Sequence, residues 1–367
     1  MLLTRPRRHL ILAVLAVLVA PVIAMPFVPF KTVSLAENRR LAPAPTLPRT
    51  AGEWRKLPRV LDAWLADHFG FRDPLMRTAG ELQRRLGGEG AAATAVTGQQ
   101  GQMFLVDGLL RSTGQELDPA RAADYAAFVC KAKARMPGVK VVASLAPSPA
   151  EIMPDLAPDW AGPARSPTEY DLVLKGLARC GVKAVDLRPS LRGARAAGQV
   201  VYRKLDSHWA LRGSLLAYNE IVPAMGRPEW GIDPKALPWA TIALDNGDLP
   251  RLAGQPPAFE QVEIHNITGL NPGYARAPIP GIAGRSVQPF MVDMRQPGPT
   301  VLIVGDSFTA DPMPPYFAPF VGKVAWVHED RCAFDWRVMA KVKPDYVLFL
   351  PAAREAVCGG ARPAHFN

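Results

Sequence analysis

The chain has 367 residues, 49% of them hydrophobic, which is enough to build the core of one large domain or of two modest ones. The formal net charge is +10, but the basic residues are scattered and no basic patch interleaved with aromatic residues stands out, so a nucleic-acid partner is not indicated. A basic surface also suits an anionic polysaccharide or a membrane surface. The 38 prolines favour a loop-rich α/β protein over a helical bundle.

The N-terminus has the pattern of a targeting segment. Three arginines within the first ten residues precede an apolar run, residues 10–30, that is long enough to cross a bilayer. Basic residues before the run and few after it place the N-terminus in the cytoplasm. Residues 1–30 are therefore predicted to be a membrane anchor or a signal peptide cut after Ala24. In either case the body is exported, and an uncleaved anchor would hold it at the periplasmic face of the inner membrane.

Residues 31–95 are predicted to be a proline-rich spacer followed by helices. Residues 57–86 have apolar positions at helical spacing, interrupted by Gly70 and Pro74, which predicts two helices. Residues 88–101 are rich in small side chains and indicate a linker or turn.

From residue 96 to the C-terminus, predicted strands and helices alternate. Asp118 is a predicted N-cap with Pro119 in the first helical position, and Gly181 ends the next helix. This alternation predicts one α/β domain, 96–367, with a mostly parallel sheet and helices on both faces. The predicted strands are 102–108, 138–147, 182–189, 299–308, 323–330 and 344–351; the helices are 118–136, 166–181 and 209–226; and 228–298 is predicted to be irregular.

Four cysteines fit an oxidising compartment, and because they form no CxxC motif a zinc site is not indicated. Their order in the chain suggests two local disulfides, although three pairings are open and free buried thiols are an alternative. The local pairs are Cys130–Cys180 and Cys332–Cys358.

A Gly-Asp-Ser motif ends one of the buried strands. Gly305 allows a sharp turn, and Ser307 follows at the carboxyl end of the strand, where open α/β sheets hold their reactive groups. The Ser307 hydroxyl can act as a nucleophile there, and its backbone N–H can face an oxyanion. Alternatively, Asp306 and Ser307 only cap a helix.

An Asp-Ser-His-Trp cluster supplies the groups that such a serine needs. A serine becomes nucleophilic when a base accepts its proton and a carboxylate orients that base. With two-residue spacing, the Asp206 carboxylate can reach Nδ1 of His208 and leave Nε2 free to face Ser307. His208 as a structural residue, or Asp206 and His208 as metal ligands, are the alternatives.

The two motifs together resemble the alginate O-acetyltransferase AlgJ/AlgX-like (DHHW) family, which has an SGNH-hydrolase-like domain. The resemblance extends from about residue 35 to the C-terminus and implies Asp206 as orienter, His208 as general base and Ser307 as nucleophile. The chain departs from the family pattern after Trp209, in residues 146–154, which lack a lysine, and at the end of the last strand. The matching segments are 37–45, 61–75, 205–213, 301–308 and 343–350.

The neighbours of these motifs have less distinctive patterns. Trp209 is expected to be a packing residue, with sugar stacking as the alternative, and Ser207 is expected to cap the following helix. Asp306 is expected to brace the serine turn or cap its helix. Candidates for oxyanion or substrate contacts are Tyr316, Arg337 and Arg354.

The resemblance implies acetyl transfer to hydroxyls of an exopolysaccharide through an acetyl-serine intermediate. It also implies an integral-membrane acyltransferase partner and no cofactor or metal ion. Two other functions share these residues: a carbohydrate acetylesterase with water as the acceptor, and a non-catalytic glycan-binding or assembly subunit.

Overall fold

The computed structural model describes residues 19–20, 23–25, 33–34, 39–70, 78, 94–267, 273–282, 287–333 and 335–358. The chain forms two compact units, one of residues 1–88 with 362–367 and one of residues 89–361. In the described part of the chain, no helix combines the length and the hydropathy needed to cross a bilayer. Most of the predicted anchor, residues 1–30, lies outside the described residues.

Among its described residues, the first unit contains the long helix α2 (Ala51–His68) and a short antiparallel pair, β1 (Val33–Ser34) and β2 (Arg39–Arg40). The helix begins before the predicted residue 57 because Thr50 caps it, accepting a hydrogen bond from the Glu53 N–H. It ends at His68, before Gly70, as the interruption predicts. The second predicted helix of this region lies almost entirely outside the described residues.

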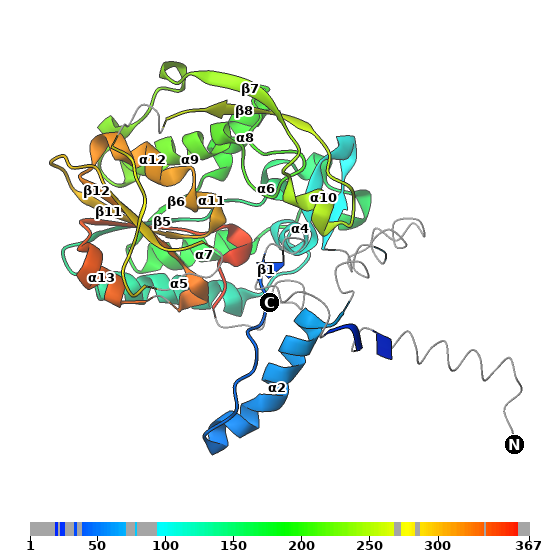
Figure 1. The fold of residues 1–367 in the computed structure, drawn as a ribbon. Helices are drawn as coiled ribbons and strands as arrows, with labels where there is room; N and C mark the ends of the chain where they lie inside the picture. Colours follow the sequence, from blue (N-terminus) through cyan, green and yellow to red (C-terminus); the bar gives the residue numbers. More distant parts are fainter. Residues whose placement is uncertain are drawn as a thin grey trace, which may run out of the picture. The chain divides into compact units, whose positions relative to one another are not determined.

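The second unit is built on a seven-stranded sheet with helices on both faces (Figure 1). The first five strands are parallel, whereas β10 is antiparallel to β12 and β9 is antiparallel to β10. The sheet is therefore mixed: its parallel part agrees with the prediction, and the antiparallel edge of β10 and β9 was not predicted. Its order is β6 (Lys183–Val185), β5 (Lys140–Ser144), β13 (Tyr346–Leu350), β11 (Thr300–Gly305), β12 (Lys323–His328), β10 (Phe290–Asp293) and β9 (Ala277–Pro278).

Strand β11 lies at the centre of the core. Val301 and Ile303 pack into the cluster on one face and Leu302 and Val304 into the cluster on the other, because successive side chains of a strand alternate. A strand buried on both faces has the continuous apolar pattern from which it was predicted. Helices α8 (Arg188–Ala196), α9 (Leu211–Ala224) and α12 (Met313–Phe317) cover the first face, and α5 (Pro119–Ala134), α7 (Glu169–Arg179) and α13 (Arg337–Val342) cover the second.

The stretch 228–298, predicted to be irregular, contains regular structure. Strands β7 (Trp239–Leu244) and β8 (Glu260–His265) pair with each other, and helix α10 (Asp248–Leu252) lies between them in the chain. The prediction was wrong because both strands are half exposed and have no buried apolar run. The same stretch also supplies β9 and β10 of the central sheet.

The strand predicted over 102–108 is also corrected. Only Met103–Leu105 form a strand, β4, which pairs with β3 (Ala95–Thr97) outside the central sheet. The chain then turns directly into helix α4 (Val106–Ser112).

Two disulfides join neighbouring elements, as predicted. Cys130 of α5 pairs with Cys180, the residue after α7, and the two helices pack side by side. Cys332 pairs with Cys358, which links the segment after β12 to the segment after β13.

Candidate active site

The turn after β11 presents Ser307 at the carboxyl edge of the sheet. A Cβ at Gly305 would lie 2.2 Å from Thr309 Oγ1 and 2.8 Å from the Leu350 carbonyl oxygen, so only glycine fits there. Asp306 then caps the short helix α11 (Ser307–Ala310) by accepting a hydrogen bond from the Phe308 N–H.

Asp306 also braces this turn against the next strand. Its second carboxylate oxygen accepts a hydrogen bond of 2.7 Å from the N–H of Ala352, just beyond β13. Both expected roles of Asp306, bracing and capping, are therefore present. Burial, with the charge of Glu355 acting in the same direction, raises the pKa of Asp306.

His208 lies on a loop that has little regular structure. Tyr202 and Trp209 form an isolated antiparallel bridge, and the Ala210 N–H donates to the Val201 carbonyl, so the chain doubles back between them. Within this loop the Asp206 carboxylate accepts a hydrogen bond from the His208 backbone N–H at 2.9 Å. The acid and the imidazole are thereby held on one side of the loop.

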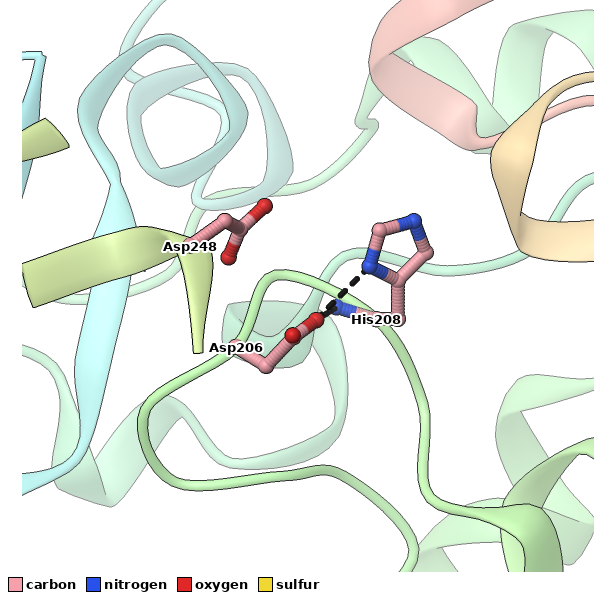
Figure 2. Close-up of side chains that lie close together, drawn as sticks. All are labelled: Asp206, His208 and Asp248. Atoms are coloured by element: carbon pink, nitrogen blue, oxygen red, sulfur yellow. Dashed lines mark hydrogen bonds and ion pairs between the residues drawn. The ribbon is translucent and has the colours of Figure 1, made fainter. Parts of the chain in front are cut away.

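The structure brings Asp206, His208 and Ser307 together. His208 Nδ1 lies 2.7 Å from Asp206 Oδ1, and His208 Nε2 lies 2.9 Å from Ser307 Oγ. The contact between Asp206 and His208 is drawn in Figure 2. A carboxylate on Nδ1 favours the tautomer that leaves Nε2 free to accept the serine proton.

The electrostatics of the pair match this arrangement. Burial works against the charged form of His208, but the hydrogen bond and the negative charge of Asp206 outweigh it, so the pKa of His208 is raised. Burial also opposes ionisation of Asp206, but its contacts with His208 and the charge of Arg203 keep the pKa of Asp206 lowered. Asp206 therefore stays ionised beside the imidazole.

The residues that follow His208 and Ser307 in the chain join the two segments. The indole N–H of Trp209 donates to the Phe308 carbonyl oxygen at 3.0 Å, and the two rings pack edge to face. The Phe308 ring also packs against the His208 imidazole, at 4.8 Å between centroids. Trp209 is buried, which supports the packing role expected from the sequence over sugar stacking.

Arg203 and Glu260 anchor the loop from the β8 side. The Arg203 guanidinium donates to Glu260 Oε1 at 2.9 Å and to Asp206 Oδ2 at 3.0 Å. The second Glu260 oxygen accepts hydrogen bonds from the backbone N–H groups of Lys204 and Leu205. Because Glu260 lies in the stretch predicted to be irregular, the sequence had not indicated it.

Asp248 contacts the same loop from α10. Its carboxylate accepts from the N–H of Ser207 at 2.7 Å and from the Ser207 hydroxyl at 2.6 Å. Figure 2 shows that Asp248 comes from a different segment and lies beside the turn between Asp206 and His208. The expectation that Ser207 caps the following helix is wrong, since Ala210 is the cap residue of α9. Asp248 lies 41 residues from Ser207 with no recognisable spacing, so sequence reasoning missed it.

Among the described residues, Asp206, His208 and Asp248 form the one group whose ligand-type atoms all lie within 4.8 Å of one another. The facing atoms already have hydrogen-bond partners. His208 Nδ1 contacts Asp206, and both Asp248 oxygens accept from Ser207. Hydrogen bonding thus accounts for the cluster without a metal ion.

The three residues expected near an oxyanion or substrate lie in different surroundings. Tyr316 is fully buried, with its hydroxyl 3.0 Å from both Ser214 Oγ and His265 Nε2. Arg337 is exposed and pairs with Asp335, two residues earlier.

Arg354 is the one of these three that reaches the candidate site. Its guanidinium lies 5.0 Å from the centroid of the Phe308 ring, and its side chain is only 10% exposed. Arg354 Nε is buried and has no hydrogen-bond partner among the described residues. Arg354 also lines a small cavity, together with Ser148, Ser207 and Leu249.

A family model matches this part of the chain. The model, ALGX, describes an SGNH hydrolase-like domain, acetyltransferase AlgX, and it covers residues 95–320, more than half of the chain. The chain belongs to this family. The sequence resemblance to the AlgJ/AlgX-like proteins is thereby confirmed.

Solved structures share the fold. A DHHW family protein from Eubacterium siraeum is similar at a TM-score of 0.50 and 15% identity, over 71% of this chain and 90% of its own. PatB1 from Bacillus cereus is similar at a TM-score of 0.50 and 13% identity, over 69% of this chain and 94% of its own. The comparison with curated proteins found no match.

Proposed function

We propose that the protein is an O-acetyltransferase that moves acetyl groups to hydroxyls of an exopolysaccharide through an acetyl-serine intermediate. The observation that carries the proposal is the continuous hydrogen-bonded array from Asp206 through His208 to Ser307. Membership in the AlgX acetyltransferase family supports acetyl transfer as the reaction and a polysaccharide as the acceptor.

In the first half-reaction, Ser307 Oγ attacks the carbonyl carbon of an acetyl donor while His208 Nε2 takes the hydroxyl proton. Asp206 stabilises the imidazolium that forms. The negative charge on the carbonyl oxygen faces the N–H of Ser307, which has no acceptor within its own helix because it is the first helical residue. The tetrahedral intermediate then expels the donor's leaving group, which takes the proton from His208.

In the second half-reaction, an acceptor hydroxyl transfers its proton to His208 and attacks the acetyl-serine ester. Collapse of this second intermediate releases the acetylated sugar, and the proton returns to Ser307 Oγ. No diffusible cofactor enters either step. Arg354, whose guanidinium lies 5.0 Å from the centroid of the Phe308 ring next to Ser307, is the expected arginine placed to contact a substrate.

We place this chemistry in the periplasm. The basic and apolar pattern of residues 1–30 supports an uncleaved inner-membrane anchor, and two disulfides suit an oxidising compartment. A tethered enzyme stays close to an integral-membrane acyltransferase that delivers acetyl groups through the bilayer. Residues 31–50, rich in proline, would act as the spacer.

The test uses Ser307→Ala, with Ser190→Ala as the matched control because Ser190 contacts Glu220 on the surface of α8. Loss of the nucleophile should lower turnover of an activated acetyl ester on the order of 10⁴–10⁶-fold at an unchanged melting temperature. Mass spectrometry should find an acetyl group on Ser307 in the wild type. Wild-type turnover by folded Ser307→Ala would refute the catalytic role of this serine.

Product analysis separates the remaining functions. The products are compared with and without an acceptor glycan. When the glycan is present, a transferase yields acetylated glycan in place of free acetate, whereas an acetylesterase yields free acetate with or without the glycan. A folded wild-type protein that forms no acetyl-serine would instead be a glycan-binding subunit.

A further inference from the structure

Ser207, the residue between Asp206 and His208, gives both of its hydrogen-bond donors to one carboxylate. Its N–H donates to Asp248 Oδ1 at 2.7 Å and its hydroxyl to Asp248 Oδ2 at 2.6 Å. Ser207 and Asp248 are 3% and 8% exposed, so water competes little for these bonds. Hydrogen bonds to an ionised acceptor in such surroundings are about twice as strong as neutral ones.

The backbone around Asp248 is itself fixed against the loop. The Leu249 N–H donates to the Leu205 carbonyl oxygen at 3.2 Å. A Cβ at Gly247 would lie 2.2 Å from that same oxygen, so α10 approaches the loop as closely as a glycine allows. The Asp248 carboxylate therefore has little freedom to move away from Ser207.

We propose that Asp248 is a positioning residue of the acetyl-transfer site, which holds the turn from Asp206 to His208 through Ser207 and places a second negative charge beside the imidazole. The inference rests on the proposed function. It assigns a mechanistic role to α10, the helix between β7 and β8 that supplies Asp248.

The charged groups that face His208 determine the sign of this effect. The carboxylates of Asp206 and Asp248 favour the imidazolium, and the guanidinium of Arg354 opposes it. Ser307 contributes only a hydroxyl. Because His208 becomes imidazolium when it takes the Ser307 proton, the charge of Asp248 stabilises the form that arises during acylation.

Two variants separate the charge from the hydrogen bonds. Asp248→Asn removes the negative charge but keeps an oxygen that accepts from the Ser207 N–H, while its NH₂ group can donate to the Ser207 hydroxyl in place of the acceptor oxygen. Ser207→Ala keeps the charge and removes one hydrogen bond. Asp233→Asn is the matched control, since Asp233 is an exposed cap residue in the same part of the chain and contacts Lys235.

The first measurement is an NMR titration of the His208 ring, which requires no turnover. His208 should titrate at lower pH in Asp248→Asn and as in the wild type in Ser207→Ala and Asp233→Asn. The second measurement is the acylation rate at a pH above the one at which His208 titrates. This rate should fall about tenfold in Asp248→Asn and several-fold in Ser207→Ala.

An unchanged His208 titration in folded Asp248→Asn would overturn the electrostatic part of the proposal, and a wild-type acylation rate in Ser207→Ala would overturn the positioning part. If Asp248→Asn does not fold, the acylation rate of Ser207→Ala still tests the positioning part of the proposal. Repeating the titration in Ser307→Ala keeps this test separate from the proposed function. If His208 titrates at lower pH in Asp248→Asn but neither the wild type nor any variant is acylated, the proposed acyl transfer is contradicted and the electrostatic role of Asp248 is not.

Discussion

Ser307 and His208 come from two regions of different construction. Ser307 follows a strand buried on both faces, and its turn is fixed by backbone packing and by the cap at Asp306. His208 lies on a loop held mainly by polar side chains, through Glu260 and Asp248. The nucleophile is thus positioned by the core, and its base by a network of charges.

The two regions also contain buried acids whose pKa values are shifted in opposite directions. Next to the serine turn, Glu329 follows β12 and its N–H donates to the Gly305 carbonyl oxygen at 2.8 Å. Burial raises the pKa of Glu329 to about 8, and the nearby charge of Asp306 acts in the same direction. In the loop, His208 and Arg203 lower the pKa of Asp206 against the effect of burial. Because the loop orients the base His208 and the turn packs into the core, substitutions in the loop should mainly change the rate, whereas substitutions at the turn should mainly change stability.

The largest effect should come from Asp206→Asn. The amide can donate to Nδ1 of His208 and favour the tautomer with a proton on Nε2, which cannot accept the Ser307 proton. Acylation should fall about 10⁴-fold while thermal unfolding changes little. Asp155→Asn, at an exposed ion pair with Arg195, is the control. A loss of less than tenfold would mean that the loop does not control the base.

Gly305→Ala should act on stability instead. The new methyl group would push against Thr309 and the Leu350 carbonyl, which should lower the free energy of unfolding by about 3 kcal/mol. Chemical denaturation measures this change. Gly193→Ala, where a Cβ meets nothing within 4 Å, should not destabilise. Equal free energies of unfolding for the two variants would show that the serine turn is not fixed by close backbone packing, contrary to its contrast with the loop.

Glu329→Gln tests the buried acid through pH. The pKa of Glu329 is raised in the folded protein, to about 8 from 4.5, so its contribution to stability is complete below pH 4.5 and is lost as the pH rises through 8. Between these values each pH unit costs up to about 1.4 kcal/mol. Glu329→Gln should therefore flatten the fall in melting temperature between pH 4.5 and pH 8. A parallel curve for the variant would show that Glu329 is ionised in the folded protein.

The smallest effect should come from the joint between the regions. Trp209→Phe removes the hydrogen bond to the Phe308 carbonyl, which is worth about 1 kcal/mol, so acylation should fall several-fold. Trp160→Phe, at a partly exposed indole, serves as the reference. An unaltered rate would mean that the two regions keep their alignment without this contact.

Much of the serine side of the site could be predicted from sequence. The run of apolar residues in β11 and the glycine of the turn are local signals, and they indicate a buried strand with Ser307 at its end. The pairing of this motif with Asp206 and His208 followed from chemistry and from the family resemblance. The disulfide pairs followed from their order in the chain.

The supports of the loop could not be predicted. Asp248 and Glu260 come from a proline- and glycine-rich stretch with half-exposed strands, where hydrophobic periodicity is weak. Their partners lie more than 40 residues away, so only tertiary structure brings them to the loop. Tyr316 was expected near the oxyanion or the substrate but is buried against α9. This burial depends on tertiary packing that the local sequence does not encode.

The hydrogen bond between His208 and Ser307 joins residues 99 positions apart in the chain. The hydrogen bond between Asp306 and Ala352 joins residues 46 positions apart. Closing such long loops is the slow part of folding a chain of this kind, because local structure forms before distant segments meet. A ribosome-bound or truncated chain that lacks β13 would hold every proposed catalytic residue but not the brace at Ala352. Labelling of Ser307 by an activated ester would therefore report the completion of folding, and its time course after dilution from denaturant would measure when the last strand docks.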